Sequence, residues 1–289
     1  MRVLITVLML LGLSACACFA AEEERWWQDR LELGGWVETI QSMRLKSPND
    51  SLTSRAKLRL ELATELDWLY GFFSADAEKN WEIASETGVD LQEAWIEHVA
   101  DNWDLRIGRQ IIIWGKADGI QVTDMISPPD YTESITRDLD EIRMPVDAAK
   151  FRWLGDSLDT ELIWIPVFKA AIRPSGDNPW AVQSDDSAAV TVYSDSTEEP
   201  DTTLENSEIA LKVSGYLSGL DIAASAFYTW DDSPAYHRHV EYAGNGSATI
   251  TYQPEHHRLT VFGLEGSSAL VRLCLSQRGS LLHGALLRA

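Results

Sequence analysis

The stretch SRAKLRLELATELDW, residues 54–68, carries two sets of side chains that alternate along the chain. The apolar set consists of Leu58, Leu60, Leu62 and Leu66. The charged set consists of Lys57, Arg59, Glu61 and Glu65. Successive side chains of a β-strand point to opposite faces of its sheet, so this period of two predicts a strand with one apolar and one charged face. Whether lipid or a second protein layer covers the apolar face decides the fold.

Further segments of the chain have the same strand-like character. They are residues 31–42, 71–79, 91–99, 103–114, 147–154, 158–168, 207–216, 219–230, 247–253 and 257–265. Short turn-like segments such as 101–102, 155–157 and 218–219 separate many of them. This spacing predicts antiparallel hairpins in sequence order, and hence an all-β protein of one domain.

Strand length and the placement of aromatic residues favour a transmembrane β-barrel over a soluble β-sandwich. Several segments reach nine or more residues, which is the length that a tilted strand needs to cross a bilayer. Barrels carry aromatic girdles at both membrane interfaces. Aromatic residues lie near the expected strand ends at Trp68, Tyr70, Phe72, Trp103, Trp114, Trp164, Phe168, Tyr228 and Trp230. A sandwich whose core holds these aromatic residues is the alternative.

The first residues predict export from the cytoplasm. An apolar run from Val3 to Leu13 follows Arg2 and precedes small residues, as in a secretory signal peptide. Cleavage after Ala20 makes residues 1–20 the signal and residues 21–269 the barrel domain. The alternative is a lipobox at residues 13–16, which would leave a lipid-bearing Cys16 as the new N-terminus. Signal removal leaves Cys274 as the one cysteine, so no internal disulfide is expected.

Charge argues against one class of partner. The formal net charge is −21, so a nucleic-acid backbone would be repelled. The segment 173–206 has many acidic residues and no lysine or arginine after Arg173, which is typical of a solvated outer loop. Its residues 182–195 could form an additional hairpin. The expected partners are instead outer-membrane lipid and lipopolysaccharide, the barrel assembly machinery, and a small solute of unknown identity.

The stretch LRIGRQIIIWGKADG, residues 105–119, places Arg109 in phase with Leu105 and Ile107. An arginine on the lipid face at the middle of a bilayer costs about 2–4 kcal/mol. A β-bulge at Gly108 would shift the phase by one residue and turn Arg109 into the lumen. The alternative is that Arg109 lies at the membrane interface and extends its charge toward water.

Three stretches, DLQEAWIEH, LRIGRQIIIWGKADGIQVTDMISPPDY and DEIRMPVDAAKF, resemble an uncharacterised group of proteobacterial outer-membrane barrels, which is porin-like and similar to alginate-export channels. The shared pattern is a G-R-Q-x-x-x-W-G strand end, a following aspartate, an Asn/Ser-Pro turn and a Glu-x-x-x-Pro segment. The matching positions are Gly108, Arg109, Gln110, Trp114, Gly115, Asp118, Pro128, Glu141 and Pro145. The resemblance spans about 60 residues. It implies an outer-membrane channel of a Gram-negative bacterium.

Residues 116–145 predict an element that folds into the barrel, as an inward loop or a short helix at 132–142 ended before Pro145. Its mixed charges would face Arg106, Arg109 and Lys116 on the wall. Opposed acidic and basic groups set ion selectivity in narrow pores, or they pin such a loop in place. The expected constriction residues are Arg106, Arg109, Lys116, Asp118, Arg137, Asp138, Asp140, Glu141 and Arg143.

No catalytic or metal motif stands out, so neither an enzyme nor a cofactor or metal ion is expected. His256 and His257 are adjacent, and successive strand positions point opposite ways. His237 and His239 share a phase but have no evident third ligand. The sequence therefore predicts passive diffusion of small solutes through a charged constriction. The alternative is a surface β-domain without transport activity, such as a lipoprotein.

The last residues differ in composition from the rest of the chain. From Leu270 onward there are arginines and no acidic or aromatic residue, whereas outer-membrane barrels usually end on an aromatic strand. We therefore expect residues 270–289 to be an anomalous tail that replaces the end of a larger barrel, as a frameshift would produce.

Overall fold

The computed structural model describes the chain from Arg30 to His283 with internal gaps. The described residues are 30–46, 49–114, 124–133, 136–138, 141–176, 178–181, 190–194, 196–243, 247–270 and 273–283. The expected signal peptide, Cys16, Lys116, Asp118 and Asp140 lie outside these residues. No helix in the described part is long and apolar enough to cross a membrane.

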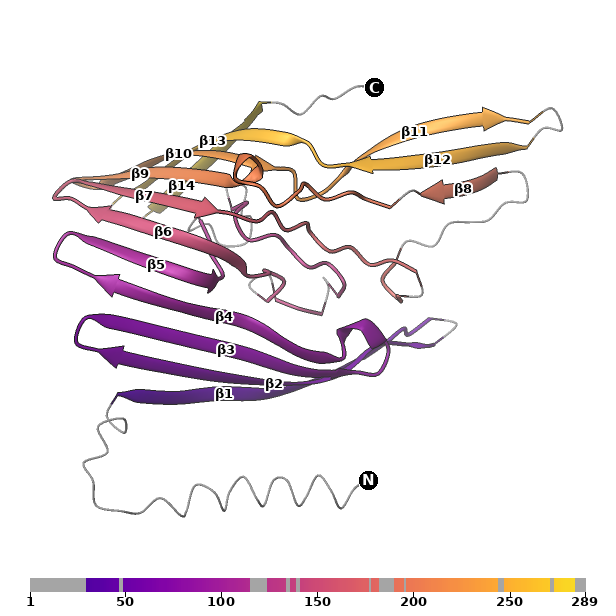
Figure 1. Ribbon diagram of the computed structural model, residues 1–289, viewed down its shortest axis with the longest axis horizontal. Helices are drawn as coiled ribbons and strands as arrows, with labels where there is room; N and C mark the ends of the chain where they lie inside the picture. Colours follow the sequence, from indigo (N-terminus) through magenta and orange to yellow (C-terminus); the bar gives the residue numbers. More distant parts are fainter. Residues whose placement is uncertain are drawn as a thin grey trace, which may run out of the picture.

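One antiparallel sheet of eleven strands dominates the described residues, and its neighbours follow the sequence order (Figure 1). Its strands are β1 (Leu31–Met43), β2 (Ser51–Leu66), β3 (Leu69–Asn80), β4 (Gly88–Val99), β5 (Trp103–Gln110), β6 (Val146–Leu154), β7 (Leu158–Ile165), β9 (Glu208–Leu217), β10 (Leu220–Trp230), β13 (Arg258–Leu270) and β14 (Leu273–His283). β1 and β14 form its two edges and do not pair with each other.

A second sheet of three strands projects beyond the main strands (Figure 1). β11 (Ala235–Tyr242) and β12 (Ala248–Glu255) form an antiparallel hairpin, and β8 (Val190–Ser194) pairs with β12 in parallel. The strand predicted at residues 247–253 is present as β12, but it belongs to this second sheet rather than to the main one, because β10 pairs directly with β13. Two short 3₁₀ helices, η1 (Ala84–Glu86) and η2 (Leu204–Asn206), lie in connections between strands.

The connections alternate between short and long, so each end of the main sheet has its own character. Tight turns of two or three residues join β2 to β3, β4 to β5, β6 to β7 and β9 to β10. The long connections, which include residues 111–145, 166–207 and 231–257, gather at the other end. This asymmetry is the one found in outer-membrane barrels, whose long loops face outward from the cell.

The two faces of the main sheet have opposite character, as the described side chains of β2 and its neighbours show. On β2, Lys57 and Arg59 form ion pairs with Asp76 of β3, and Lys57 is only 4% exposed. The leucines of the other phase are exposed, as are the apolar residues paired beside them across the sheet. This apolar face includes Leu33, Val37, Leu60, Phe73, Ile96, Ile107, Leu211 and Ile222. An apolar surface of this extent is unstable in water, whereas lipid covers it without cost.

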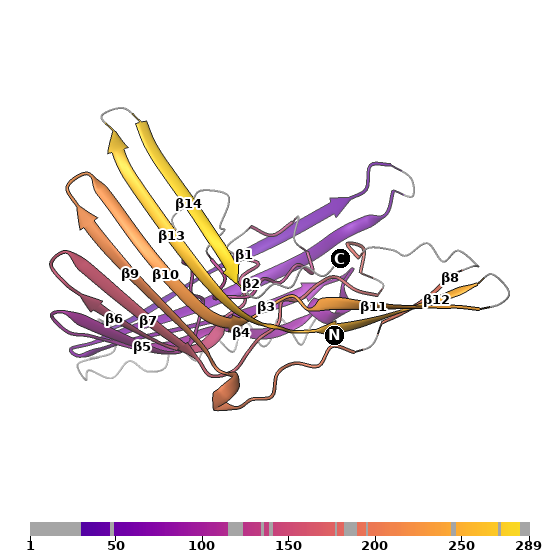
Figure 2. The same cartoon turned by 90° about the horizontal axis from the view of Figure 1, so that it is seen from above.

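Aromatic side chains border the apolar face at both ends of the strands. Trp68, His98, Trp103, Phe151 and Trp153 follow one another across the tight-turn end, with ring centroids of His98 and Trp103 5.1 Å apart. Toward the other end, Trp164 and Tyr228 flank Ile209 in one row of paired residues. These rows form the girdles expected of a membrane barrel. The fold is therefore an antiparallel β-barrel wall of the transmembrane type, curved but not closed (Figure 2).

Gly108 keeps its strand in register, contrary to the predicted bulge. β4 and β5 pair without a register shift from Ala94↔Arg109 to Val99↔Asp104. The pairing of β5 with β6 likewise has no register shift. Gly108 has φ +133°, and a Cβ there would lie 2.3 Å from the carbonyl oxygen of Ala94. Glycine is thus required for close backbone approach rather than for a phase shift. The register shift of β4 lies opposite Ser74 and Ala75 of β3 instead.

Candidate functional site

Residues 111–145, which we call the inward segment, connect β5 to β6, and the described residues among them lie on the concave side of the sheet. Their described residues contact two separate parts of the wall. One end packs against the inner phase of β6, β7, β9, β10 and β13, and the other contacts β2 and β3. The predicted inward element is therefore present. The predicted helix over 132–142 is not, because its described residues form turns, such as the one closed by Thr136 N–H donating to the carbonyl of Glu133.

The first contact of the inward segment is an apolar cluster. Ile112, Trp114 and Ile126 pack with wall residues, which are Val146, Ala148, Ile163, Ile165, Ala210, Phe227, Leu259 and Val261. Polar groups at the margin of the cluster form hydrogen bonds. The backbone N–H of Trp114 donates to Asp124 Oδ1 (2.9 Å), and the indole N–H of Trp114 donates to Glu161. Because these side chains are almost fully buried, the cluster fixes this end of the segment by hydrophobic packing.

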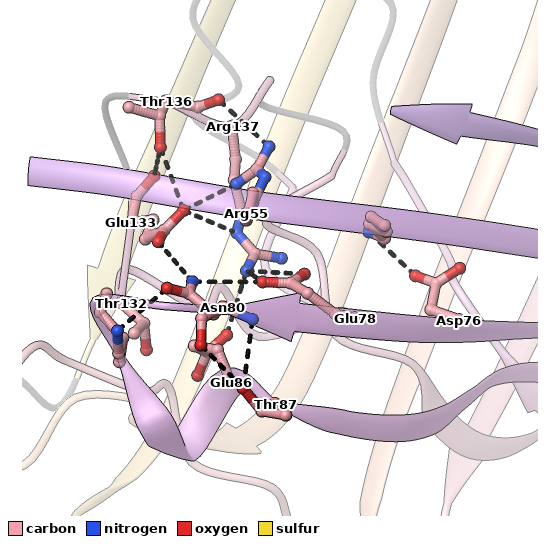
Figure 3. Close-up of polar contacts among 12 residues, drawn as sticks. Arg55, Asp76, Glu78, Asn80, Glu86, Thr87, Thr132, Glu133, Thr136 and Arg137 are labelled. Atoms are coloured by element: carbon pink, nitrogen blue, oxygen red, sulfur yellow. Dashed lines mark hydrogen bonds and ion pairs between the residues drawn. The ribbon is translucent and has the colours of Figure 1, made fainter. Parts of the chain in front are cut away.

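The second contact, which we call the polar latch, joins six side chains (Figure 3). They are Arg55, Glu78, Asn80, Glu86, Glu133 and Arg137. At its centre, the fully buried Glu133 accepts hydrogen bonds from Arg55 Nη1 (2.7 Å) and Asn80 Nδ2 (2.8 Å). Two charges this deeply buried are tolerated because each carboxylate oxygen has a donor.

Arg137 forms the second half of the polar latch. Its Nη2 atom lies 3.2 Å from Glu78 of β3 and 3.0 Å from Glu86 of η1. Burial raises the pKa of Glu86 to about 7, and the nearby carboxylates of Asp130, Glu78 and Glu133 add to this effect. The positive charge of Arg137 lowers the pKa of Glu86, but Arg137 also interacts with Glu78 and Glu133. The latch therefore contains one carboxyl group that titrates near neutral pH.

Arg109 and Arg106, the predicted constriction residues of β5, lie on opposite phases of that strand. Arg109 lies on the outer phase beside Leu105 and Ile107, where it forms an exposed ion pair with Asp147 at 3.0 Å. Its predicted place in the lumen is wrong, and the alternative of an interfacial arginine fits its position at the end of β5. Arg106 does face inward, over the ring of Trp95 (3.7 Å to the centroid) and beside Glu97.

Besides Arg137, three described residues of the predicted set belong to the inward segment itself. Arg143 bonds within it, to Asp124 at 2.8 Å, and Glu141 lies 3.9 Å from Arg55. The carbonyl of Asp138 accepts a hydrogen bond from Glu141 N–H. The segment was expected to face Arg106 and Arg109, but its charges contact β2 and β3 instead. Arg55, Glu78, Asn80 and Glu86 were missed, although Arg55 shares the charged phase of Lys57 and Arg59.

A cavity of about 430 Å³ lies beside the inward segment on the concave side. Trp114 and its neighbours cover one side of it. Charged and polar wall residues line the rest, namely Lys150, Arg152, Asp159, Thr160, Glu161, Lys212, Ser214 and Tyr216. Ion pairs with other inner-wall acids hold Arg152 to Asp104 and Lys212 to Glu265. Such a lining hydrates readily, so the space can hold water and small polar solutes.

Comparison with known proteins gives one family match and several distant structural ones. Residues 78–176 match a family described as "Protein of unknown function (DUF1302)". That stretch includes β4, β5 and the inward segment. No curated protein matches the chain.

Solved structures similar to the chain include porins. The Salmonella typhi OmpF complex with daunomycin has 11% identity and a TM-score of 0.40; the match covers 85% of this chain and 64% of that one. A mutant of the Rh. blastica porin has 11% identity and a TM-score of 0.35, over 88% and 85% of the two chains. Pseudomonas putida OprB at high pH has 11% identity and a TM-score of 0.34, over 89% and 71%.

Proposed function

We propose that this protein is a porin-like channel of the outer membrane of a Gram-negative bacterium, through which small solutes diffuse passively. The charged cavity beside the inward segment is the observation that carries the proposal. A barrel wall with an apolar outside needs no such lining on its inside unless water occupies it. Lys150 and Arg152 of β6 and Lys212 of β9 face that space, with Glu161 of β7 between them.

The inward segment narrows this passage because it reaches from the apolar cluster on one part of the wall to the polar latch on another. We propose that Arg137, Asp138, Glu141 and Arg143 lie at the constriction, together with Arg106 on the wall. Lys116, Asp118 and Asp140 remain predictions from the sequence. Arg109 has no such role in this proposal, since it lies on the outer phase.

Planar-bilayer recording of the purified full chain tests the proposal. Steady, ohmic conductance is expected, with a reversal potential in a KCl gradient that depends on the charge of the lumen. Lys150→Glu should shift the reversal potential toward cation preference, because it replaces a positive charge at the cavity with a negative one. Arg109→Glu is the matched control: the same kind of charge reversal on the outer face should leave the reversal potential unchanged.

A folded, membrane-inserted chain that never conducts would contradict the channel and favour the β-domain without transport activity. Heat-modifiable migration in gels establishes that the chain is folded in each recording. Equal shifts from Lys150→Glu and Arg109→Glu would contradict the assignment of the concave side as the solute path.

A further inference from the structure

Three side chains meet at the base of the projecting hairpin, at the long-loop end of the sheet. They are His237 of β11, Glu255 at the end of β12, and His257 in the link from β12 to β13. His237 Nε2 lies 3.5 Å from Glu255 Oε2. The rings of His237 and His257 are perpendicular, with centroids 5.7 Å apart. One nitrogen or oxygen atom from each residue lies within 4.8 Å of the others.

The backbone around these residues holds them in place. Ala235 pairs with Glu255 and His237 with Gln253, so His237 and Glu255 are diagonal neighbours on one face of the hairpin. The carbonyl of His257 accepts a hydrogen bond from Asp231 N–H at 2.8 Å. His256 points the other way, buried edge-on against Phe168 at 5.0 Å, and its Nδ1 contacts the carbonyl of Asp231. His256 therefore anchors the link that presents His257.

The chemistry of the donors indicates a transition-metal ion. Two imidazoles and one carboxylate suit Zn²⁺, Cu²⁺ or Ni²⁺, whereas Mg²⁺ and Ca²⁺ prefer oxygen ligands alone. A tetrahedral ion with bonds of about 2.1 Å holds its donors about 3.4 Å apart, so small side-chain rotations suffice. All three side chains are accessible to solvent, which leaves a fourth position for water.

We propose that His237, Glu255 and His257 bind one divalent transition-metal ion of the Zn²⁺ class. The bound ion would tie β11 and the end of β12 to the point where β13 enters the wall. This site lies apart from the cavity beside the inward segment, so the proposal goes beyond passive diffusion. The sequence alone did not indicate it, because His257 is twenty residues from His237 and only the hairpin brings them together.

Calorimetric titration of ZnCl₂ into the tag-free full chain, folded in detergent at pH 7.5, tests the site. One ion per chain is expected, with affinity at least tenfold weaker for His237→Ala and for His257→Ala. Glu255→Gln should weaken binding by a smaller factor. His239→Ala is the matched control, because His239 lies on the same strand and phase but pairs with Glu241, outside the three-residue cluster. It should bind Zn²⁺ as the wild type does.

Hydrogen exchange gives a second readout. Zn²⁺ should slow exchange of β11 and β12 amides in the wild type and in His239→Ala, and leave exchange in His237→Ala unchanged. Wild-type affinity in His237→Ala, or an equal loss in His239→Ala, would overturn the proposal. Mg²⁺ at millimolar concentration should not displace Zn²⁺, and displacement would equally overturn it. Heat-modifiable migration confirms that each variant is folded before titration.

Discussion

The two ends of the inward segment are held by opposite kinds of interaction. Ile112, Trp114 and Ile126 pack in an apolar cluster, whereas Glu133 and Arg137 form the polar latch with β2, β3 and η1. Hydrophobic packing involves no titrating group and so does not depend on pH, whereas ion pairs with a titrating partner do. A rise in pH should therefore weaken the hold of the latch on the segment while the apolar cluster stays packed.

Breaking the centre of the polar latch should have the largest effect. Glu133→Ala leaves Arg55, which is 2% exposed, with Glu38 at 3.0 Å as its remaining close partner, and breaking a buried ion pair costs about 3–5 kcal/mol. Trypsin should then cleave folded protein after Arg137 much faster than in the wild type. The double variant Arg55→Met/Glu133→Leu removes both charges and should restore resistance. If a well-folded double variant were still cleaved rapidly by trypsin, the unpaired charge of Arg55 would not be the cause of the loss.

Weakening the apolar end should have a smaller effect that does not depend on pH. Ile126→Ala removes a side chain that is 3% exposed, which costs about 2–4 kcal/mol for a buried aliphatic residue. Denaturant-dependent hydrogen exchange of the peptide that contains Trp114 measures this loss. The loss should be the same at pH 5.5 and pH 8. A marked difference between the two would show that the apolar cluster is coupled to the latch.

The polar latch should weaken as pH rises from about 4.5 to about 7. The pKa of Glu86 is raised to about 7 from its ordinary value near 4.5, so the folded state holds its proton more tightly than the unfolded one. Its contribution is complete below the ordinary value and is lost as pH rises through about 7, by about 2 kcal/mol. Hydrogen exchange of the peptide containing Glu133 and Arg137 measures it. Glu86→Gln should remove the dependence; an unchanged dependence would assign it to another group.

Removing the ion pair of Arg109 should have the smallest effect. Arg109 and Asp147 are 38% and 52% exposed in their side chains, and exposed pairs contribute about 0–1 kcal/mol. Arg109→Gln should leave both the latch and the apolar cluster intact, as judged by trypsin resistance and by hydrogen exchange of the peptide that contains Trp114. A loss comparable to that of Glu133→Ala would mean that Arg109 supports the inward segment from outside.

Strand positions were predictable because alternation is local. The leucines from Leu58 to Leu66 and the tight turns near residues 101, 156 and 218 defined most strands of the main sheet. β11 was missed, since its exposed polar residues show little alternation. Residues 273–283, within the segment expected to be an anomalous tail, form a strand that pairs with β13. That this segment replaces the end of a larger barrel stays a prediction.

The candidate site was only partly predictable because its partners are distant in sequence. That residues 116–145 fold inward followed from their charges and lack of alternation. Their partners Arg55 and Glu78 lie more than fifty residues away, and many other acids and bases in the chain could have paired equally well. At Gly108, the sequence showed that glycine matters but not whether it relieves a backbone contact or shifts the register.

The sequence by itself determined that long antiparallel strands carry one apolar and one charged face, because the period of two belongs to each strand alone. It also determined the order of hairpins, since tight turns join neighbours in sequence. Only the tertiary structure decided which wall the inward segment contacts, that Arg109 points outward, and that His257 reaches His237. These depend on contacts between residues far apart in the chain, where register and curvature, rather than local pattern, select the partner.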